Sequence, residues 1–439
     1  MNENKIEYYM NRNVKLHPLL NALTWDVIFV WTISTMFFTT QKGLSFSQTI
    51  TLDSILMAFG CLFCVPVQKI FQRMKSTDVI RFAFLGYAGY LILCIFGTNF
   101  FSFILAQPFL AFGYAVNAVK INGILTNSLH YVGRDKDYQR ICGKGLSYYY
   151  AIECVGAVLI TYVYNWNAYV PYWISLGVVV FGFLYSFLFK SPDKFQQSNV
   201  SLDAQVSAKK VEKKPDGYFK MLTSGFFVCL LVFAMLFRGA VSIAGSSYKI
   251  YLNQIVDANA IPIWLFGYLF AISRLTTVFS SKYQFKFNLK FGVRSLIIIV
   301  SLVVICFLGT GLLYLYNPTS MISIIGIIIL CCVLSALRMP NQIFINNYMQ
   351  VCMPKRNMER AYAIRTMVEY LGYAAISALY AGLLSTFNDN WGLTNIVYIG
   401  ILVVPLIASI TFFIRALIKK HAEKFTVIKD EYTKDEIES

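Results

Sequence analysis

Long apolar stretches separated by short polar segments dominate this sequence. A helix needs roughly 20 mostly apolar residues to cross a bilayer, and the chain holds about twelve stretches of that kind. Only 14% of the 439 residues are charged, against about a quarter in soluble domains. The spans are expected at 17–40, 48–70, 78–97, 100–128, 140–165, 169–190, 219–252, 261–281, 292–315, 320–348, 360–386 and 393–417. The sequence therefore predicts an all-α protein of twelve transmembrane helices with the lipid bilayer as its surroundings.

Lysine and arginine gather in every second connection between these spans. The basic clusters lie within 5–15, 69–75, 134–140, 209–214, 282–290, 355–360 and 419–424. The intervening loops hold little more than Lys42 and Lys249. Short loops rich in Lys and Arg face the cytoplasm, so both termini are predicted to be cytoplasmic and the protein to lie in the inner (plasma) membrane. The same pattern gives the formal charge of +16 a topological meaning and excludes a nucleic-acid partner.

The chain divides into two similar halves. A polar, Ser- and Lys-rich segment, 191–217, reads as a cytoplasmic linker between six-helix bundles at 17–190 and 218–418. Residues 1–16 and 419–439 form the cytoplasmic ends. An offset of 216 residues aligns Glu153 with Glu369 and Gly156 with Gly372. Repeats of this kind, related by a pseudo-twofold axis along the membrane normal, are typical of alternating-access transporters.

Over its whole length the chain resembles bacterial secondary transporters of the major facilitator superfamily. The resemblance rests on the six-plus-six layout, the central linker, the basic loops after helices 2 and 8, and two segments. These segments are LSFSQTITLDSILMAFGCLFCVPV (44–67) and GRDKDYQRICGKGLSYYYAIECVGAV (133–158). The loop after helix 2 keeps basic residues but lacks the family's usual Gly and Asp positions, and helix 5 lacks the Gly-Pro pattern of proton-antiporting drug exporters. The resemblance implies a cavity lined by helices 1, 4, 7 and 10.

Ionisable and polar side chains inside the spans are the candidate functional residues, because burying a charge in a membrane is costly. We expect substrate binding or coupling from Asp26, Asn117, Lys120, Glu153, Arg238, Arg274, Arg338, Asn341, Gln342 and Glu369.

Asp26 is the most informative of these residues. A carboxylate in the apolar stretch NALTWDVIFVW is costly to ionise and could carry a proton near neutral pH. The alternative is a structural ion pair, most simply with Arg238, its approximate repeat equivalent.

Each remaining candidate also has a structural alternative. Arg338, Asn341 and Gln342 share one helix face, as do Asn117 and Lys120, but amides in membranes also hold helices together. Glu369 is spaced to pair with Arg365 on its own helix, whereas Glu153 has only Lys144 down its helix.

Aromatic and histidine residues add no cofactor site. Tyr148, Tyr149 and Tyr150 could stack on a sugar or another ring, but an interfacial aromatic belt is the preferred interpretation. His17, His130 and His421 fall at predicted helix ends or tails, so no haem or metal is expected.

These features favour a secondary active transporter that moves a small polar or anionic solute by alternating access. Proton-coupled symport is preferred, with Na⁺ as another conceivable coupling ion, and the protein is expected to act as a monomer. The alternatives are an exporter of drug-like or lipidic substrates, a flippase for lipid-linked oligosaccharides, and a membrane-embedded transferase. An enzyme is disfavoured because the outer loops are too short to hold a catalytic site and no histidine is available for one. No ATP-binding motif occurs, so the chain is not expected to hydrolyse ATP.

The topology can be tested with reporter fusions. Fusions within 191–217 and at the carboxyl terminus should both report a cytoplasmic location, because the basic loops flank both sites. An external signal from either fusion would contradict the predicted orientation.

Overall fold

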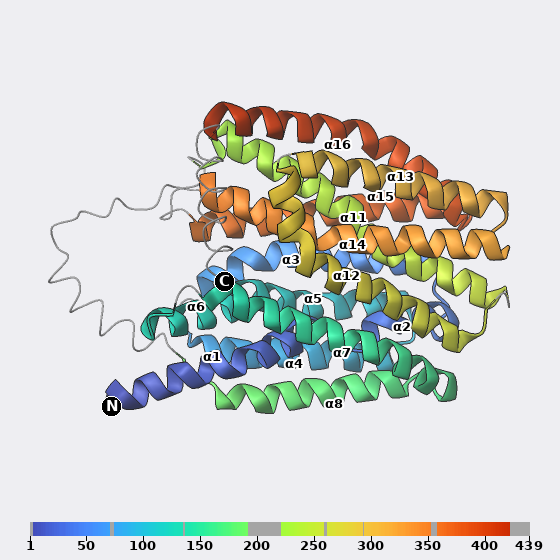
Figure 1. Ribbon diagram of the computed structural model, residues 1–439. Coiled ribbons are helices and arrows are strands. Elements are labelled where there is room, and N and C mark those ends of the chain that lie inside the picture. The colour runs from blue at the N-terminus through green and yellow to red at the C-terminus, as the bar shows by residue number, and fades with distance from the viewer. Residues whose placement is uncertain are drawn as a thin grey trace. The chain divides into compact units, whose positions relative to one another are not determined.

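The computed structural model describes residues 3–70, 74–134, 137–191, 221–258, 261–292, 294–352 and 358–421. All regular elements among these residues are helices (Figure 1). The predicted linker, apart from Ser191, lies outside the described residues, and so does the tail after His421.

The chain forms two compact units. Unit 1 comprises residues 1–213 and 252–275, and unit 2 comprises 214–251 and 276–439. The elements of the first half are α1 (Glu3–Trp25), α2 (Val30–Met36), the π-helix η1 (Phe37–Gln41), α3 (Phe46–Ile70), α4 (Ser76–Phe96), α5 (Phe100–Val116), the π-helix η3 (Asn117–Ile121), α6 (Asn122–Tyr131), α7 (Tyr138–Trp166), α8 (Val170–Tyr185) and the 3₁₀ turn η5 (Ser186–Leu188). The elements of the second half are α11 (Gly225–Asp257), α12 (Ile263–Phe291), α13 (Arg294–Tyr316), α14 (Met321–Cys352), α15 (Met358–Thr386) and α16 (Trp391–His421). Both α11 and α12 contribute residues to the two units.

Ten of the described helices are long and apolar enough to cross a membrane. Shorter apolar helices, Phe100–Val116 and Met321–Leu337, stand at the places of the predicted fourth and tenth spans. The protein is therefore a multi-pass membrane protein, and the number twelve stays a prediction.

Two details of the predicted spans were wrong. The first span is not one continuous helix: α1 runs from Glu3 to Trp25, and the four residues 26–29 separate it from α2. Lys249 does not lie in a loop, because α11 continues to Asp257, and only 2% of the lysine is exposed.

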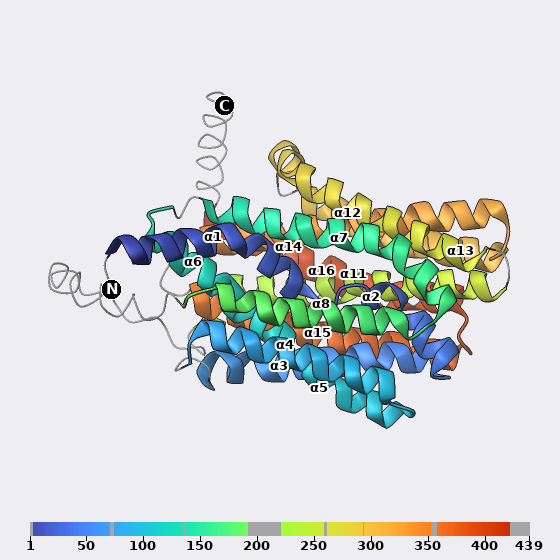
Figure 2. The same ribbon diagram turned by 90° about the horizontal axis from the view of Figure 1, so that it is seen from below.

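Within unit 1, α1 packs along α7 and α6, and α4 packs between α5 and α8 (Figure 2). Glycine permits the close approach of α4 and α5, because a Cβ atom at Gly113 would overlap the ring of Tyr87. Small residues are the usual means of close helix contact in membranes. The same contact places the Tyr87 hydroxyl 2.8 Å from the carbonyl oxygen of Thr24.

Within unit 2, α13 packs against α14 and α16. A buried polar network also joins α11, α15 and α16. The Tyr380 hydroxyl donates to Asn395 Oδ1 at 2.7 Å, and Trp391 Nε1 donates to the Ser247 hydroxyl at 2.7 Å. The Tyr251 ring stacks on Trp391 with 4.9 Å between ring centroids. These contacts hold one end of α11 to its own bundle.

The contact at Gly113 leads to a stability prediction. Gly113→Ala should lower the free energy of unfolding by about 1–3 kcal/mol, since the added methyl group displaces Tyr87 from a packed interior. The matched control is Gly177→Ala, where no atom lies within 4 Å of an added Cβ. Thermal unfolding of the detergent-purified variants measures the difference, and equal midpoints for the two variants would contradict this account.

Candidate functional site

The first helix is interrupted in the middle of its span. Residues 26–29 are not helical, and Phe29 has a φ of 76°, a conformation that L-residues rarely adopt. An interrupted helix frees backbone carbonyl groups, and each would cost several kcal/mol if left without a donor in a bilayer. The interruption therefore needs partners from other helices.

Three other elements supply these partners. The Thr24 carbonyl accepts hydrogen bonds from the Tyr87 hydroxyl of α4 at 2.8 Å and from Asn117 Nδ2 of η3 at 2.7 Å. The Ile28 carbonyl accepts a hydrogen bond from the Ser175 hydroxyl of α8 at 2.7 Å. Asn117, predicted as a cavity residue, thus helps to hold the interrupted helix.

Asp26 is the first residue of this interruption. Its Oδ1 atom accepts hydrogen bonds from the Val27 backbone N–H at 2.7 Å and from the Tyr114 hydroxyl at 2.5 Å. The side chain is half-buried in unit 1. Arg238 belongs to unit 2, so the alternative ion pair between Asp26 and Arg238 stays a prediction.

Glu153 forms an ion pair with Arg274 within unit 1. Their charged atoms lie 3.4 Å apart, and the two residues are only 3% and 6% exposed. Among the described residues neither Glu153 oxygen has a hydrogen-bond partner. The Arg274 guanidinium lies 4.5 Å from the centroid of the Phe270 ring and also interacts electrostatically with Asp26. Asp26, Glu153 and Arg274 are called the charged cluster below.

Aromatic residues neighbour the charged cluster along the chain: Trp25 precedes Asp26, and Tyr149 and Tyr150 lie one turn before Glu153 on α7. Tyr149 lies between Trp25 and Tyr150, with centroid distances of 6.2 and 5.1 Å. Tyr149 and Tyr150 are 4% and 5% exposed, so the interpretation of these two as belt residues was wrong, whereas Tyr148 is 40% exposed. The helical period of α7 turns Tyr149 and Tyr150 inward.

In unit 2 the equivalent glutamate, Glu369, pairs within its own helix. Arg365 Nε donates to Glu369 Oε1 at 2.7 Å within α15, as the spacing predicts, and both residues are buried. The glycines three residues further along have matching roles. An added Cβ at Gly156 would meet the ring of Phe29, and one at Gly372 would meet Met235. In unit 1 the space beside the glycine is filled by Phe29 from the interruption of the first span, and in unit 2 by Met235 from α11.

The remaining predicted cations and amides lie on three other elements. Lys120 lies on η3 and is partly buried, and Arg238 lies on α11 with a buried Nε that has no hydrogen-bond partner among the described residues. Arg338, Asn341 and Gln342 lie on α14, but their side chains fall outside the described part of the chain.

Sequence reasoning missed several groups. Tyr114 carries no sequence signal that connects it with Asp26. The placement of His17 at a helix end was wrong: it is fully buried inside α1, with Nε2 3.2 Å from the Ile121 carbonyl, because the helix begins at Glu3. No group of three metal-ligating side chains occurs among the residues that the structure describes.

The two buried ion pairs lead to a matched prediction. Glu153→Gln should destabilise the protein by about 3–5 kcal/mol, because Arg274 loses its buried counter-charge. Adding Arg274→Gln should recover much of that loss. The corresponding Glu369→Gln and Arg365→Gln variants should show the same pattern, a large loss from the single change and recovery in the double variant. Thermal unfolding of all six variants measures both coupling energies, and strictly additive effects would show that the pairs do not interact.

Known proteins resemble this chain in structure. No protein-family model matches the sequence, and no curated protein sequence matches it significantly. The solved nucleoside transporter NupG superposes with a TM-score of 0.67 at 14% identity, over 92% of this chain and 99% of its own. A POT family transporter in complex with a thioalcohol-conjugated peptide gives 0.65 at 13% identity, over 92% and 96%. A D-xylose-proton symporter gives 0.61 at 13%, over 90% and 97%. The resemblance seen in the sequence is confirmed at the level of architecture: the chain has the fold of the major facilitator superfamily.

Proposed function

We propose that this protein is a secondary active transporter that moves a small polar or anionic solute by alternating access, coupled to proton symport. The proposal rests on Asp26, a carboxylate at the interruption of the first helix, and on the buried Glu153–Arg274 pair of the same unit. The predicted domain boundaries, cytoplasmic termini and monomeric state belong to the same proposal.

The charged cluster has the composition that proton coupling needs. It contains two carboxyl groups and one guanidinium, so binding of one proton neutralises these three groups together. A neutral cluster is less costly in free energy inside the membrane than a charged one, so protonation makes it easier for the surrounding helices to move. A proton that binds Asp26 or Glu153 from one side and leaves toward the other would couple its movement to that of the solute.

Asp26 is suited to sense a conformational change. It lies where the backbone is not held by helical hydrogen bonds, and its partner Tyr114 is on α5. A small rotation of α2 against α5 would therefore alter the surroundings of the carboxylate. Interrupted helices occupy this role at the binding sites of other transporters.

The pairing of Arg274 favours a polar solute over an anionic one. The anionic alternative was based on four intramembrane cations, namely Lys120, Arg238, Arg274 and Arg338. Arg274 already has Glu153 as its carboxylate partner, so it is not available to bind an anionic solute. The names of the structural neighbours support the same direction, since they refer to a nucleoside, to D-xylose with a proton and to a peptide.

Replacement of Asp26 tests the coupling. Asp26→Asn keeps the shape and hydrogen-bonding capacity of the side chain but cannot titrate. In proteoliposomes with an imposed pH gradient, uptake of D-xylose or uridine, whichever the wild-type protein accumulates, should fall to the level of protein-free vesicles. Counterflow of the same solute should persist, because it needs no net proton movement.

The matched control is Asp137→Asn, which removes a surface carboxylate paired with Arg134. Its energised uptake should equal that of the wild type. Full energised uptake by Asp26→Asn would remove Asp26 from the coupling mechanism, and loss of counterflow as well would assign Asp26 to solute binding instead.

A further inference from the structure

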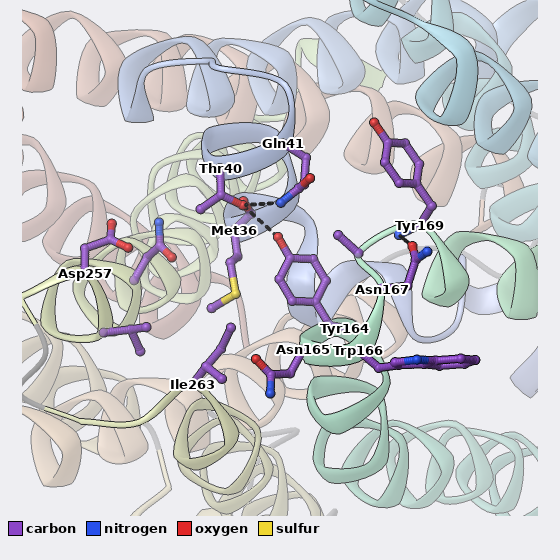
Figure 3. A pocket seen from close by; sticks show the side chains of 13 residues that line it. Met36, Thr40, Gln41, Tyr164, Asn165, Trp166, Asn167, Tyr169, Asp257 and Ile263 are labelled. Atoms are coloured by element: carbon purple, nitrogen blue, oxygen red, sulfur yellow. Dashed lines mark hydrogen bonds between the residues drawn. The ribbon is translucent and has the colours of Figure 1, made fainter.

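A cavity of about 540 Å³ lies in unit 1. Figure 3 shows the side chains that line it. It is formed by the ends of η1, α7 and α11 and by the start of α12. Its rim residue Trp166 is 13 residues along α7 from Glu153, a distance of about 20 Å at 1.5 Å per residue. The cavity is therefore separate from the charged cluster, and it is called the vestibule below.

The walls of the vestibule are polar but almost uncharged. They include four side-chain amides, from Gln41, Asn165, Asn167 and Asn253. Hydroxyl groups come from Thr40, Tyr164 and Tyr169, and Asp257 is the one charged side chain among the lining residues. Lys42, the residue after Gln41, lies over the Tyr169 ring and donates to the carbonyls of Ile95 and Gly97 at 2.9 and 2.8 Å. An anion would meet no cation in this lining, whereas a neutral solute would meet donors and acceptors.

One acceptor in the wall is buried without a donor. Asn253 is fully buried, and its Nδ2 atom donates to the Thr39 hydroxyl at 3.0 Å. Its Oδ1 atom has no hydrogen-bond partner among the described residues. A buried acceptor left unsatisfied costs about 1–3 kcal/mol, so a ligand hydroxyl or N–H that reaches it is favoured. Asn253 is thus an unsatisfied acceptor in the wall of the vestibule.

Other polar groups of the vestibule wall are already ordered by hydrogen bonds. The Thr40 and Tyr164 hydroxyls lie 2.7 Å apart, and Gln41 Nε2 approaches Thr40 Oγ1 at 3.5 Å, as the dashed lines in Figure 3 show. Asn167 Oδ1 accepts the backbone N–H of Tyr169 at 2.9 Å, which fixes the turn after α7. Ordered polar groups bind a ligand with less loss of entropy.

Trp166 supplies an aromatic face. It is 82% exposed, and in the view of Figure 3 it lies on the side of the group away from Asp257. Tryptophan at a membrane interface is ordinary, but here the indole lies beside amides and hydroxyls around one cavity. An indole face packs against the C–H face of a flat ring, and neighbouring amides bind the hydroxyls at its edge.

We propose that the vestibule binds a neutral, polyhydroxylated ring solute, of the sugar or nucleoside class, before the solute reaches the charged cluster. The inference deepens the proposed function, on which it rests, by naming the substrate class and a second binding site. The volume lies within the range of about 300–1,000 Å³ typical of small-molecule sites. The Asp257 carboxylate can accept hydrogen bonds from two hydroxyls of such a ring. A cationic amine would pair with Asp257 but make no use of the side-chain amides in the wall.

The test measures equilibrium binding of D-xylose, D-glucose and uridine to the purified full chain by calorimetry, beside benzoate and choline. At least one neutral probe should bind, and both ions should bind more weakly. Trp166→Ala should weaken neutral-probe binding about tenfold, equivalent to about 1.4 kcal/mol. Asn165→Ala should act in the same direction, and neither exposed position endangers folding. The control Trp173→Ala removes a half-exposed indole of α8 outside the vestibule and should leave binding unchanged.

The remaining outcomes separate this inference from the proposed function. Binding that is lost in Asp26→Asn but unchanged in Trp166→Ala and Asn165→Ala would place the solute at the charged cluster alone and overturn the vestibule. Stronger binding of choline or benzoate, or no binding of any neutral probe, would overturn the ligand class. Vestibule binding without energised uptake would contradict the transport proposal and leave the vestibule intact.

Discussion

The absence of water from the bilayer interior is the constraint on which the rest of this structure depends. A helix satisfies its own backbone, but the first helix of this protein is interrupted at residues 26–29. Donors on α4, η3 and α8 satisfy the carbonyls of Thr24 and Ile28. The interruption is therefore maintained by packing, and that packing depends on Gly113, which leaves room for the Tyr87 ring.

Buried charge imposes the second constraint, and the two halves meet it in different ways. Glu369 pairs with an arginine one turn away, so the pair is complete once α15 forms. Glu153 pairs with Arg274 of α12, so it is neutralised only when two helices meet. A pair between helices can separate when the helices move, while a pair within one helix stays closed. This difference is why the proposed coupling role is assigned to the charged cluster of unit 1.

The proposed sites differ in chemistry in a way that suits one transport cycle. The vestibule offers amides, hydroxyls and an aromatic ring, which recognise a neutral solute without a strong field. The charged cluster offers titratable groups, which respond to protons. In the proposed cycle, solute selection and proton response therefore rest on different residues, and Glu153 and Trp166 are about 20 Å apart along α7.

The sequence by itself determined the helical membrane class, the approximate spans and the presence of intramembrane charges. Hydrophobic length and the position of a charge are local properties, so a single stretch of chain reveals them, as does the spacing of Arg365 and Glu369. Only the tertiary structure decided where the first helix breaks, which partner Glu153 takes, and that His17 and Lys249 are buried. The contacts that hold the interruption join residues 63 to 147 positions apart. No local pattern encodes such pairs, because they form only when separate helices pack together.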